Sequence, residues 1–524
     1  MPDRPNVVLF TVDQLSARWI EDPTCPVPTP NLDRLRNEGV TFPNTFSSNP
    51  VCAPARATLA TGLTSRQHGV LQNGYRLDPT LPTVMDRLQA SGYRTGGFGK
   101  FHFVPQYAGP YPDYERYGFD VTHITEDSRI GAWLDWVESV HPDQYEAALA
   151  TVWQTDIPGL DHYGDQDRDL RKEIESAQAG FDWGDEAFAQ DSPAAYTLPF
   201  PAAVSQTNWI TDRGLDFLRS SDNDRSRRDP FFAHFSYVQP HAPACPPAEY
   251  LSAVETAEIP DPIPPEWPDD PDAPACFRSG DPARHSHLDL PAHWRRHREY
   301  YFADIAHLDA QLGRVLDAIA DRGGLEETVV IFLSDHGDLL YDHGFTGKGQ
   351  KHYDGAIRVP LTIAGPGLET GIERPELVQL EDIVPTILGL TGTRPPERTT
   401  VSSFLDDDAG LSPLPGTSLG PLCRGESPDW RAYAYIESYN NVYSTAPTHW
   451  ARTIRSADYR YTYYPQDSGE QLFHLASDPN EQTNLASDPA AREVKHRLRK
   501  RLLDQVVLQD YPHPDRGLQW LGVP

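Results

Sequence analysis

An almost unbroken apolar run near the start of the chain limits the possible folds most. Asn6 to Val12 reads NVVLFTV, which is too short for an ordinary helix and lacks the alternation of a half-exposed strand. Such runs are typical of parallel strands that are covered on both faces. Thr328 to Leu333 is a second run of the same kind. The sequence therefore predicts a parallel sheet between two layers of helices.

Helical and apolar segments alternate through the first 395 residues. Helices are expected at 30–38, 54–61, 81–90 and 305–319, and further strands at 93–98 and 231–238. This alternation predicts an α/β fold with a large, mostly parallel sheet. Two polar stretches, 155–195 and 259–275, are rich in Asp with Gln and Gly or with Pro, so we expect surface excursions there.

The character of the chain changes after Leu390-Thr391-Gly392. We place a first domain at 1–395 and a smaller α+β domain at 396–524. Residues 396–430 are loop-like, whereas Tyr459 to Tyr464 is aromatic and favours an antiparallel sheet. A terminal helix is expected from about Asp488, with one apolar stripe formed by Val494, Leu498, Leu502 and Val506.

Charge and composition exclude several classes of function. The formal net charge is −31, which argues against a nucleic-acid binder and against a peripheral protein on anionic lipid. No stretch approaches the roughly 18 apolar residues that span a bilayer, and no leader pattern precedes the first strand. We therefore expect a cytoplasmic protein. The five cysteines are widely spaced without a CxxC pair, which indicates neither a disulfide framework nor a zinc knuckle.

Chemically active side chains follow two of the expected strands. Asp13 and Gln14 end the first run, and Asp335 and His336 end the run at 328–333. Open α/β sheets bind ligands at the carboxyl ends of their strands. Two carboxylates and an imidazole suit a divalent cation such as Ca²⁺, with Mn²⁺ next because of the imidazole. Gln14 is neutral, and whether it is a ligand stays open.

A third group lies at the start of the helix expected at 54–61. Cys52 opens the string Cys52-Ala53-Pro54-Ala55-Arg56, and the amino end of a helix favours an anion. Arg56 follows one turn later, close enough to reach back toward residue 52. A single cysteine at such a position is more often buried and inert.

The complete C-x-P-x-R string resembles the signature of the type I sulfatases, which belong to the alkaline-phosphatase-like superfamily. Their other motifs follow in the family's order, over residues 6 to about 510: Gly99-Lys100-Phe101-His102, Gln239-Pro240-His241, Ser334-Asp335-His336-Gly337, Gly347-Lys348-Gly349, and the tail at 472–485. Ala55 stands where the family mostly has Ser or Thr. Gln14 stands where it usually has Asp, which puts the identity of the metal in doubt.

The resemblance implies hydrolysis of a sulfate monoester of an aryl or carbohydrate alcohol. It implies that a formylglycine-generating enzyme oxidises Cys52 to formylglycine (3-oxoalanine), and that a covalent sulfo-enzyme intermediate forms there. It also implies one divalent ion held by Asp13, Gln14, residue 52, Asp335 and His336. The catalytic residues that it implies are Cys52, Arg56, Lys100, His102, His241 and Lys348. Asn73 and Arg66 are candidate substrate contacts, with structural roles as the alternative.

Three alternatives remain open on the sequence. Phosphonate monoester or phosphodiester hydrolases of the same superfamily share the Asp-Gln pair and C-x-P-A-R, but they generally lack the Lys and His kept here as Lys100 and His102. An inactive relative that binds sulfated glycans is the second alternative. An unmodified Cys52 that acts as a thiol nucleophile is the third. The alcohol that leaves and the oligomeric state are not readable from the sequence.

Overall fold

The computed structural model describes residues 4–509 except for 22–24, 106–107, 154, 165–167, 184–194, 221–228, 269, 271–272, 275–276, 278–290, 394–413, 440–449 and 466–468. Its α-helices are α1 (Arg18–Glu21), α2 (Pro30–Asn37), α3 (Cys52–Thr61), α4 (Ser65–His68), α5 (Val84–Ala90), α6 (Ala132–Val140), α7 (Tyr145–Ala150), α8 (Leu170–Gly180), α10 (Gln206–Ser220), α11 (Ala248–Leu251), α14 (Pro291–Ala320), α15 (Asp354–Ile357), α16 (Ile383–Leu390), α17 (Gly420–Cys423) and α18 (Arg492–Gln509).

An eight-stranded sheet forms the centre of the molecule. Its order is β10 (Ile372–Glu373), β2 (Gly39–Thr41), β9 (Leu361–Ala364), β7 (Thr328–Ser334), β1 (Asn6–Val12), β6 (Phe231–Ser236), β4 (Arg94–Gly99) and β5 (Val121–Ile124). The five strands from β7 to β5 run parallel, and β9 is antiparallel to both of its neighbours. The predicted α/β fold with a mostly parallel sheet is confirmed.

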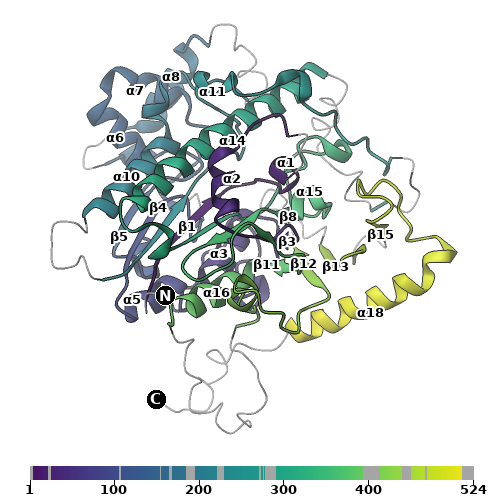
Figure 1. Cartoon of the computed structure of the whole chain (residues 1–524). Coiled ribbons are helices and arrows are strands. Elements are labelled where there is room, and N and C mark those ends of the chain that lie inside the picture. The colour runs from purple at the N-terminus through teal and green to yellow at the C-terminus, as the bar shows by residue number, and fades with distance from the viewer. Residues whose placement is uncertain are drawn as a thin grey trace, which may run out of the picture.

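Helices cover both faces of this sheet (Figure 1). Alternate residues of β1 divide between two hydrophobic clusters: Val8 and Phe10 pack with α2, α10 and α14, whereas Val7 and Leu9 pack with α3, α5 and α16. This double burial explains why β1 is apolar at nearly every position, because neither of its faces meets water.

Several sequence-based boundaries require correction. Helix α14 begins at Pro291, well before the expected start at residue 305, and α3 begins at Cys52 itself. Residues 155–195 are not only a surface excursion, since α8 buries Leu170 and Ile174 in the core. These residues lie one helical turn apart, a spacing that makes one apolar face. Of the loop expected at 396–430, residues 396–413 lie outside the described residues. The described part, 414–430, contains the short helix α17.

The C-terminal part carries a four-stranded antiparallel sheet, as predicted. Its strands in order are β12 (Ala434–Ser438), β13 (Ala451–Arg455), β14 (Tyr459–Tyr464) and β15 (Gly469–His474). A smaller sheet of β11 (Val378–Gln379), β3 (Thr45–Phe46) and β8 (Arg358–Val359) lies in the large unit. The domain division at 395/396 stays a prediction.

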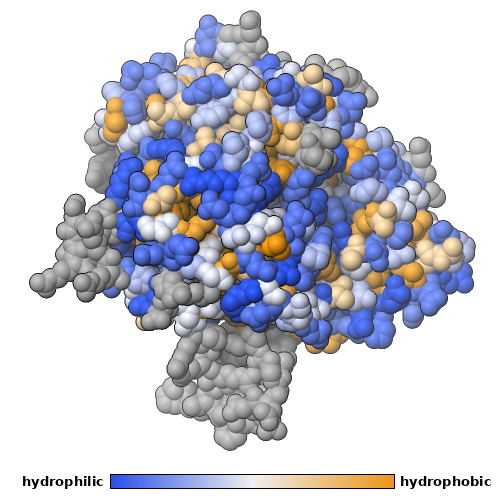
Figure 2. All heavy atoms as spheres, in the orientation of Figure 1, coloured by the Kyte–Doolittle hydropathy of each residue, from blue (hydrophilic) through white to orange (hydrophobic). Residues whose placement is uncertain are grey.

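The terminal helix α18 packs against this antiparallel sheet. Leu498 and Leu502 are buried in one cluster with Tyr461, and Val494 and Val506 pack at its edge. The expected apolar stripe is therefore confirmed. Among the described helices, none combines the length and apolar character needed to cross a membrane. Hydrophilic residues dominate the visible surface, with scattered hydrophobic ones between them (Figure 2).

Glu381 gives the fold a pH dependence that can be measured. This residue is 5% exposed beside α3, and burial together with the adjacent Asp382 raises its pKa to about 7. The folded pKa exceeds the unfolded value, so the stabilisation is complete at low pH and is lost as the pH rises through 7. We expect Glu381→Gln to unfold at a higher urea concentration than wild type at pH 8, by about 2–3 kcal/mol in unfolding free energy.

The advantage should shrink to about 1 kcal/mol or less at pH 5, where the folded wild-type carboxyl is protonated. Glu373→Gln on the exposed strand β10 removes the same charge and serves as the control. Equal urea midpoints for Glu381→Gln and wild type at pH 8 would contradict the raised pKa.

Candidate active site

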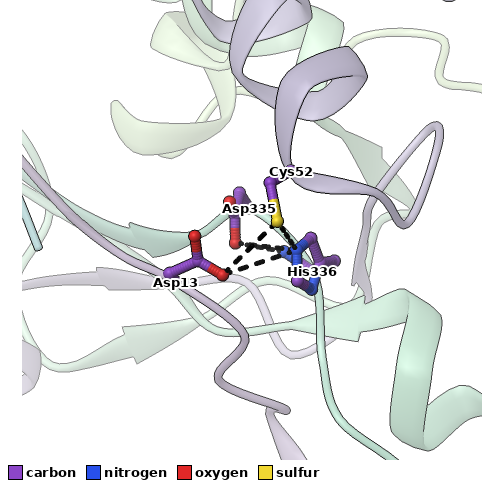
Figure 3. A group of neighbouring side chains, drawn as sticks. All are labelled: Asp13, Cys52, Asp335 and His336. Carbon is purple, nitrogen blue, oxygen red and sulfur yellow. Dashed lines mark hydrogen bonds and ion pairs between the residues drawn. The ribbon is translucent and has the colours of Figure 1, made fainter. Parts of the chain in front are cut away.

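The ends of β1 and β7 meet the first residue of α3 at one buried point (Figure 3). β1 and β7 pair in parallel up to their last residues, so Asp13 and Asp335 leave the sheet side by side. One ligand atom from each of Asp13, Cys52, Asp335 and His336 lies within 4.8 Å of the others. All four residues are buried. The structure therefore brings four of the five predicted metal-site residues into one cluster.

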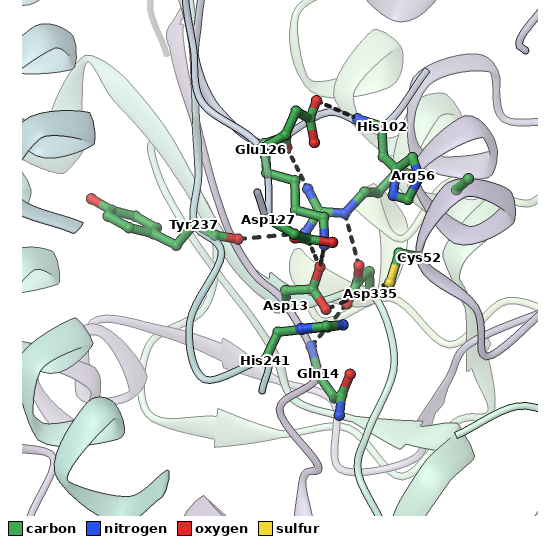
Figure 4. Close-up of polar contacts among 12 residues, drawn as sticks. Asp13, Gln14, Cys52, Arg56, His102, Glu126, Asp127, Tyr237, His241 and Asp335 are labelled. Atoms are coloured by element: carbon green, nitrogen blue, oxygen red, sulfur yellow. Dashed lines mark hydrogen bonds and ion pairs between the residues drawn. The ribbon is translucent and has the colours of Figure 1, made fainter. Parts of the chain in front are cut away.

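Arg56 holds the two carboxylates from the next turn of α3 (Figure 4). Its Nε donates to Asp335 at 2.8 Å, and its Nη2 donates to Asp13 at 3.1 Å. Its Nη1 donates to Ser236 Oγ at 2.7 Å and to the backbone oxygen of Lys100. Burial disfavours the charged guanidinium, but the pKa of Arg56 is still raised because the two carboxylates outweigh burial. Arg56 is thus engaged by protein groups and fixes both carboxylates in place.

Lys100 follows β4 and is fully buried. Its Nζ lies 2.6 Å from Asp13 Oδ2 and also forms an ion pair with Asp127. Burial opposes the positive charge, but Asp127 and Asp13 raise the pKa of Lys100. The pKa of Asp13 is lowered because, against burial and the adjacent Cys52, the nearby cations favour its charged form. Lys100 is therefore a fixed positive charge at the base of the cluster.

The Cys52 sulfur is surrounded by groups that favour an anion. Lys348 Nζ lies 2.9 Å from Sγ, and His336 Nε2 lies 3.3 Å from it. Burial raises the pKa of the thiol, yet Lys100, Lys348 and His336 together hold that pKa well below its usual value. A hydrogen bond from the His102 side chain acts in the same direction. The surroundings of residue 52 thus stabilise negative charge on its side chain.

Gln14 has its side-chain amide held at both ends. Its Oε1 accepts from Lys348 Nζ at 2.6 Å, and its Nε2 donates to Asp338. The backbone has a φ of 70°, a left-handed conformation that is unusual for a residue other than glycine. A hydrogen bond from its N–H to Asp335 and one from the Tyr301 hydroxyl to its carbonyl hold it there. The hydrogen bond to Asp338 therefore orients the amide so that its oxygen faces Lys348.

His102 and His241 approach the cluster from neighbouring strands. His102 follows β4, and its backbone N–H donates to Glu126 Oε1 at 3.1 Å. His241 follows β6 and lies beside Asp13 and Gln14 in Figure 4. Its Nδ1 lies 2.7 Å from the carbonyl oxygen of residue 242, so Nδ1 carries the proton there. His241 is among the groups that lower the pKa of Asp13, after Lys100, so its imidazole lies near that carboxylate.

The two predicted substrate contacts lie outside the cluster. Asn73 Oδ1 accepts from the backbone N–H of Ala53 at 3.0 Å, so Asn73 satisfies a donor at the amino end of α3. Arg66 lies on α4, and its Nη1 donates to the carbonyl of Val506 in α18 at 3.4 Å. The structure thus gives Asn73 a helix-capping contact and Arg66 a position next to the C-terminal helix.

Sequence reasoning missed three carboxylates of this site. Glu126 and Asp127 follow β5, a short strand that the sequence analysis did not identify, and Asp338 follows the motif at 334–337. Glu126 also accepts from the Tyr114 hydroxyl at 2.8 Å. For Asp338 the available signal was its position shortly after the expected strand at 328–333, because acidic residues after a parallel strand lie at the ligand-binding edge of the sheet. Glu126 and Asp127 had no such signal, because the strand before them was not identified.

The assembled groups suit the transfer of an oxyanion. Oxygen and imidazole ligands from two strand ends favour a divalent cation, and the lysines beside residue 52 favour a negatively charged reactant. These groups are fixed by buried ion pairs, so they need little rearrangement when charge develops.

Comparisons with known proteins agree with this chemistry. The sulfatase family model matches residues 5–393, and the model of the N-sulphoglucosamine sulphohydrolase C-terminal region matches residues 341–507. An arylsulfatase of Clostridium perfringens is 27% identical, over 99% of this chain and 98% of that protein. A choline-sulfatase of Rhizobium meliloti is 29% identical, over 93% and 83%.

A solved structure has the same fold. The phosphonate monoester hydrolase of Agrobacterium radiobacter superposes with a TM-score of 0.73 at 24% identity, covering 97% of this chain and 96% of that one. At that identity the likeness concerns the fold alone, whereas the family model spans most of the chain. The chain therefore belongs to the sulfatase family of sulfuric ester hydrolases.

Proposed function

We propose that this protein hydrolyses a sulfate monoester of an aryl or carbohydrate alcohol at residue 52. One observation carries the proposal: the buried Cys52 sulfur has Lys348 Nζ at 2.9 Å and His336 Nε2 at 3.3 Å. A sulfate ester is attacked slowly because its anionic oxygens repel nucleophiles. Positive charges fixed around the point of attack offset that repulsion in the transition state.

The residues at this point fit one divalent ion. Asp13, Asp335 and His336 offer two carboxylates and an imidazole, and the Gln14 amide oxygen faces the same side. This mainly oxygen donor set favours Ca²⁺ first and Mn²⁺ next. When bound, the ion would polarise the sulfate oxygens. Lys100 and Lys348 would remain as positive charges in addition to the ion, since Lys100 is held by Asp13 and Asp127.

Formylglycine at position 52 would provide an oxygen nucleophile in place of the thiol. Cys52 is fully buried at the start of α3, so a formylglycine-generating enzyme must reach it before α3 packs. In the folded protein His102 hydrogen bonds the side chain of residue 52 and is placed to move a proton there. Lys348 and His241 are both half-buried, and by the family likeness they would bind the sulfate and the oxygen that leaves.

The strongest alternative is hydrolysis of phosphonate monoesters or phosphodiesters. Gln14 and Ala55 match that group of enzymes in the sequence, and a phosphonate monoester hydrolase has this fold. Lys100 and His102 weigh against it, because both lie at residue 52 and those enzymes generally lack them. An inactive glycan-binding relative has weaker support, since the cysteine, the carboxylates and the lysines are all present.

A substrate panel on metal-defined enzyme tests the proposal. Protein co-expressed with a formylglycine-generating enzyme is assayed on phenyl sulfate, sugar sulfates, choline sulfate and a phenyl phosphonate monoester, before and after chelation. We expect sulfate esters to have the highest kcat/KM and chelation to reduce turnover by at least about 100-fold. Elemental analysis should find one divalent ion per chain, and peptide mass spectrometry should find sulfur replaced by oxygen at residue 52.

A kcat/KM for the phosphonate ester above that of every sulfate would favour the alternative enzyme. Full activity of metal-free protein, or two ions per chain, would contradict the single-ion site. Full activity with an unmodified thiol would contradict the formylglycine nucleophile.

A further inference from the structure

A second large cavity lies between α4, the C-terminal sheet and α18. Its volume is about 1070 Å³, and its wall includes Arg66 from α4, Arg452 from β13 and three residues of α18, which are His496, Arg499 and Lys500. The described residues that line it include no Asp or Glu. In a chain with a formal net charge of −31, such a collection of basic groups makes this cavity a local site for an anion.

Carboxylates lie beside three of these cations. On α18, Lys500 is 3.2 Å from Asp504, which also lies 3.7 Å from Arg501. Arg452 is 3.8 Å from Glu437, and Arg499 is 3.5 Å from Glu470. Glu437 is buried, and burial raises its pKa. Glu470 is shared with Lys495, so the local balance stays positive.

Aromatic rings alternate with the cations along the same wall. The Arg452 guanidinium lies 4.3 Å from the centre of the Tyr439 ring and 5.6 Å from that of Trp450. Arg499 lies 5.7 Å from the centre of the Tyr463 ring. Leu502 and Val506 complete the wall. Aromatic and aliphatic groups bind an apolar, flat body, while the neighbouring guanidinium groups bind a charge attached to it.

Two connections tie this cavity to residue 52. The carbonyl of Leu71, which lines the cavity, accepts from Asn49 Nδ2 at 3.3 Å, three residues before Cys52. The carbonyl of Tyr439 accepts from Gln350 Nε2 at 3.3 Å, two residues after Lys348. Two hydrogen bonds therefore join the wall of the cavity to residues within three positions of Cys52 and of Lys348.

We propose that this cavity receives the alcohol part of the substrate, and that this alcohol is an aromatic or similarly apolar group with a second anionic substituent. The assignment rests on the proposed sulfatase function for the reaction itself. It gives Arg66 the substrate contact that the sequence suggested, at the far end of the substrate from the sulfate.

Matched substrates and matched variants test this assignment. Phenyl sulfate and 3-carboxyphenyl sulfate differ by one carboxylate, which changes the acidity of the leaving phenol little. We expect wild type to favour the carboxylated ester in kcat/KM. In the variant Arg499→Gln/Lys500→Gln, the ratio of kcat/KM for the carboxylated ester to kcat/KM for phenyl sulfate should fall about tenfold. This fall is equivalent to about 1.4 kcal/mol. Binding of 3-hydroxybenzoate, followed by NMR titration, should weaken in parallel.

The control is Arg497→Gln/Arg501→Gln, which removes the same charge from α18 at exposed positions outside the cavity wall. Its substrate ratio should stay within about twofold of wild type. Equal losses in both variants would overturn the proposal, because long-range charge would then explain the preference. A wild-type enzyme without the preference and without 3-hydroxybenzoate binding would also overturn it.

The NMR titration with 3-hydroxybenzoate tests the cavity independently of the proposed reaction. If no sulfate ester is hydrolysed, but 3-hydroxybenzoate binds wild type and not Arg499→Gln/Lys500→Gln, the reaction assignment fails and the cavity assignment stands. If sulfate esters are hydrolysed and the cavity binds no carboxylated phenol, the reaction assignment stands and the cavity assignment fails.

Discussion

Replacement of Cys52 by alanine should abolish turnover and leave the protein folded. Residue 52 carries the proposed nucleophile, and alanine has no reactive atom to take its place. The fold should tolerate the change. Val51 is the N-cap of α3, so no cap is lost, and deletion of one buried sulfur costs about 1 kcal/mol. The measurements are steady-state turnover of the best substrate and the urea midpoint.

Cys423→Ala provides the matched control. Cys423 is also a fully buried thiol, but it packs in the hydrophobic cluster of α16 and α17 away from the carboxylates. This variant should keep wild-type turnover. Retention of more than about a tenth of wild-type activity by Cys52→Ala would refute covalent catalysis at this residue, since loss of a nucleophile typically costs several orders of magnitude.

Replacement of Lys100 by alanine should slow turnover by about 100- to 1,000-fold, the typical cost of removing one preorganised charge contact. It should also lower stability by about 3–5 kcal/mol, because Asp13 and Asp127 lose their shared buried partner. The two losses have separate causes. Rapid mixing that follows the first equivalent of alcohol, together with urea unfolding, measures each of them.

The variant Lys100→Met/Asp127→Asn separates the two losses. It removes one charge of each sign, so part of the stability should return while the first turnover stays slow. His102→Ala supplies the contrast in mechanism. It should release one equivalent of alcohol in a burst and then stall, because the proposed mechanism gives His102, which hydrogen bonds residue 52, the proton transfer after the first step. Full recovery of the rate in Lys100→Met/Asp127→Asn would show that Lys100 acts only through stability.

Local patterns predicted much of the centre of the molecule. The run Asn6 to Val12 forms β1 with the same bounds, because a strand covered on both faces needs apolar side chains throughout. The meeting of Asp13 with Asp335 was also predictable, since neighbouring parallel strands end at the same edge. The likeness of the motifs brought Lys100, His102 and Lys348 into the candidate site, although no local pattern places them near residue 52.

Other features depend on contacts between distant parts of the chain. Asp127 pairs with Lys100 only because β5 lies beside β4, and Asp338 reaches Gln14 across more than three hundred residues. Arg66 meets Val506 over a separation of 440 residues, which places it at the cavity beside α18 and outside the cluster at residue 52. The sequence by itself determined the central buried strands, the order of the motifs along the chain and the family, because doubly buried strands and local turns have recognisable residue patterns. Only the tertiary structure decided which charges pair and which cavity is cationic, because those depend on long-range packing that leaves no local pattern.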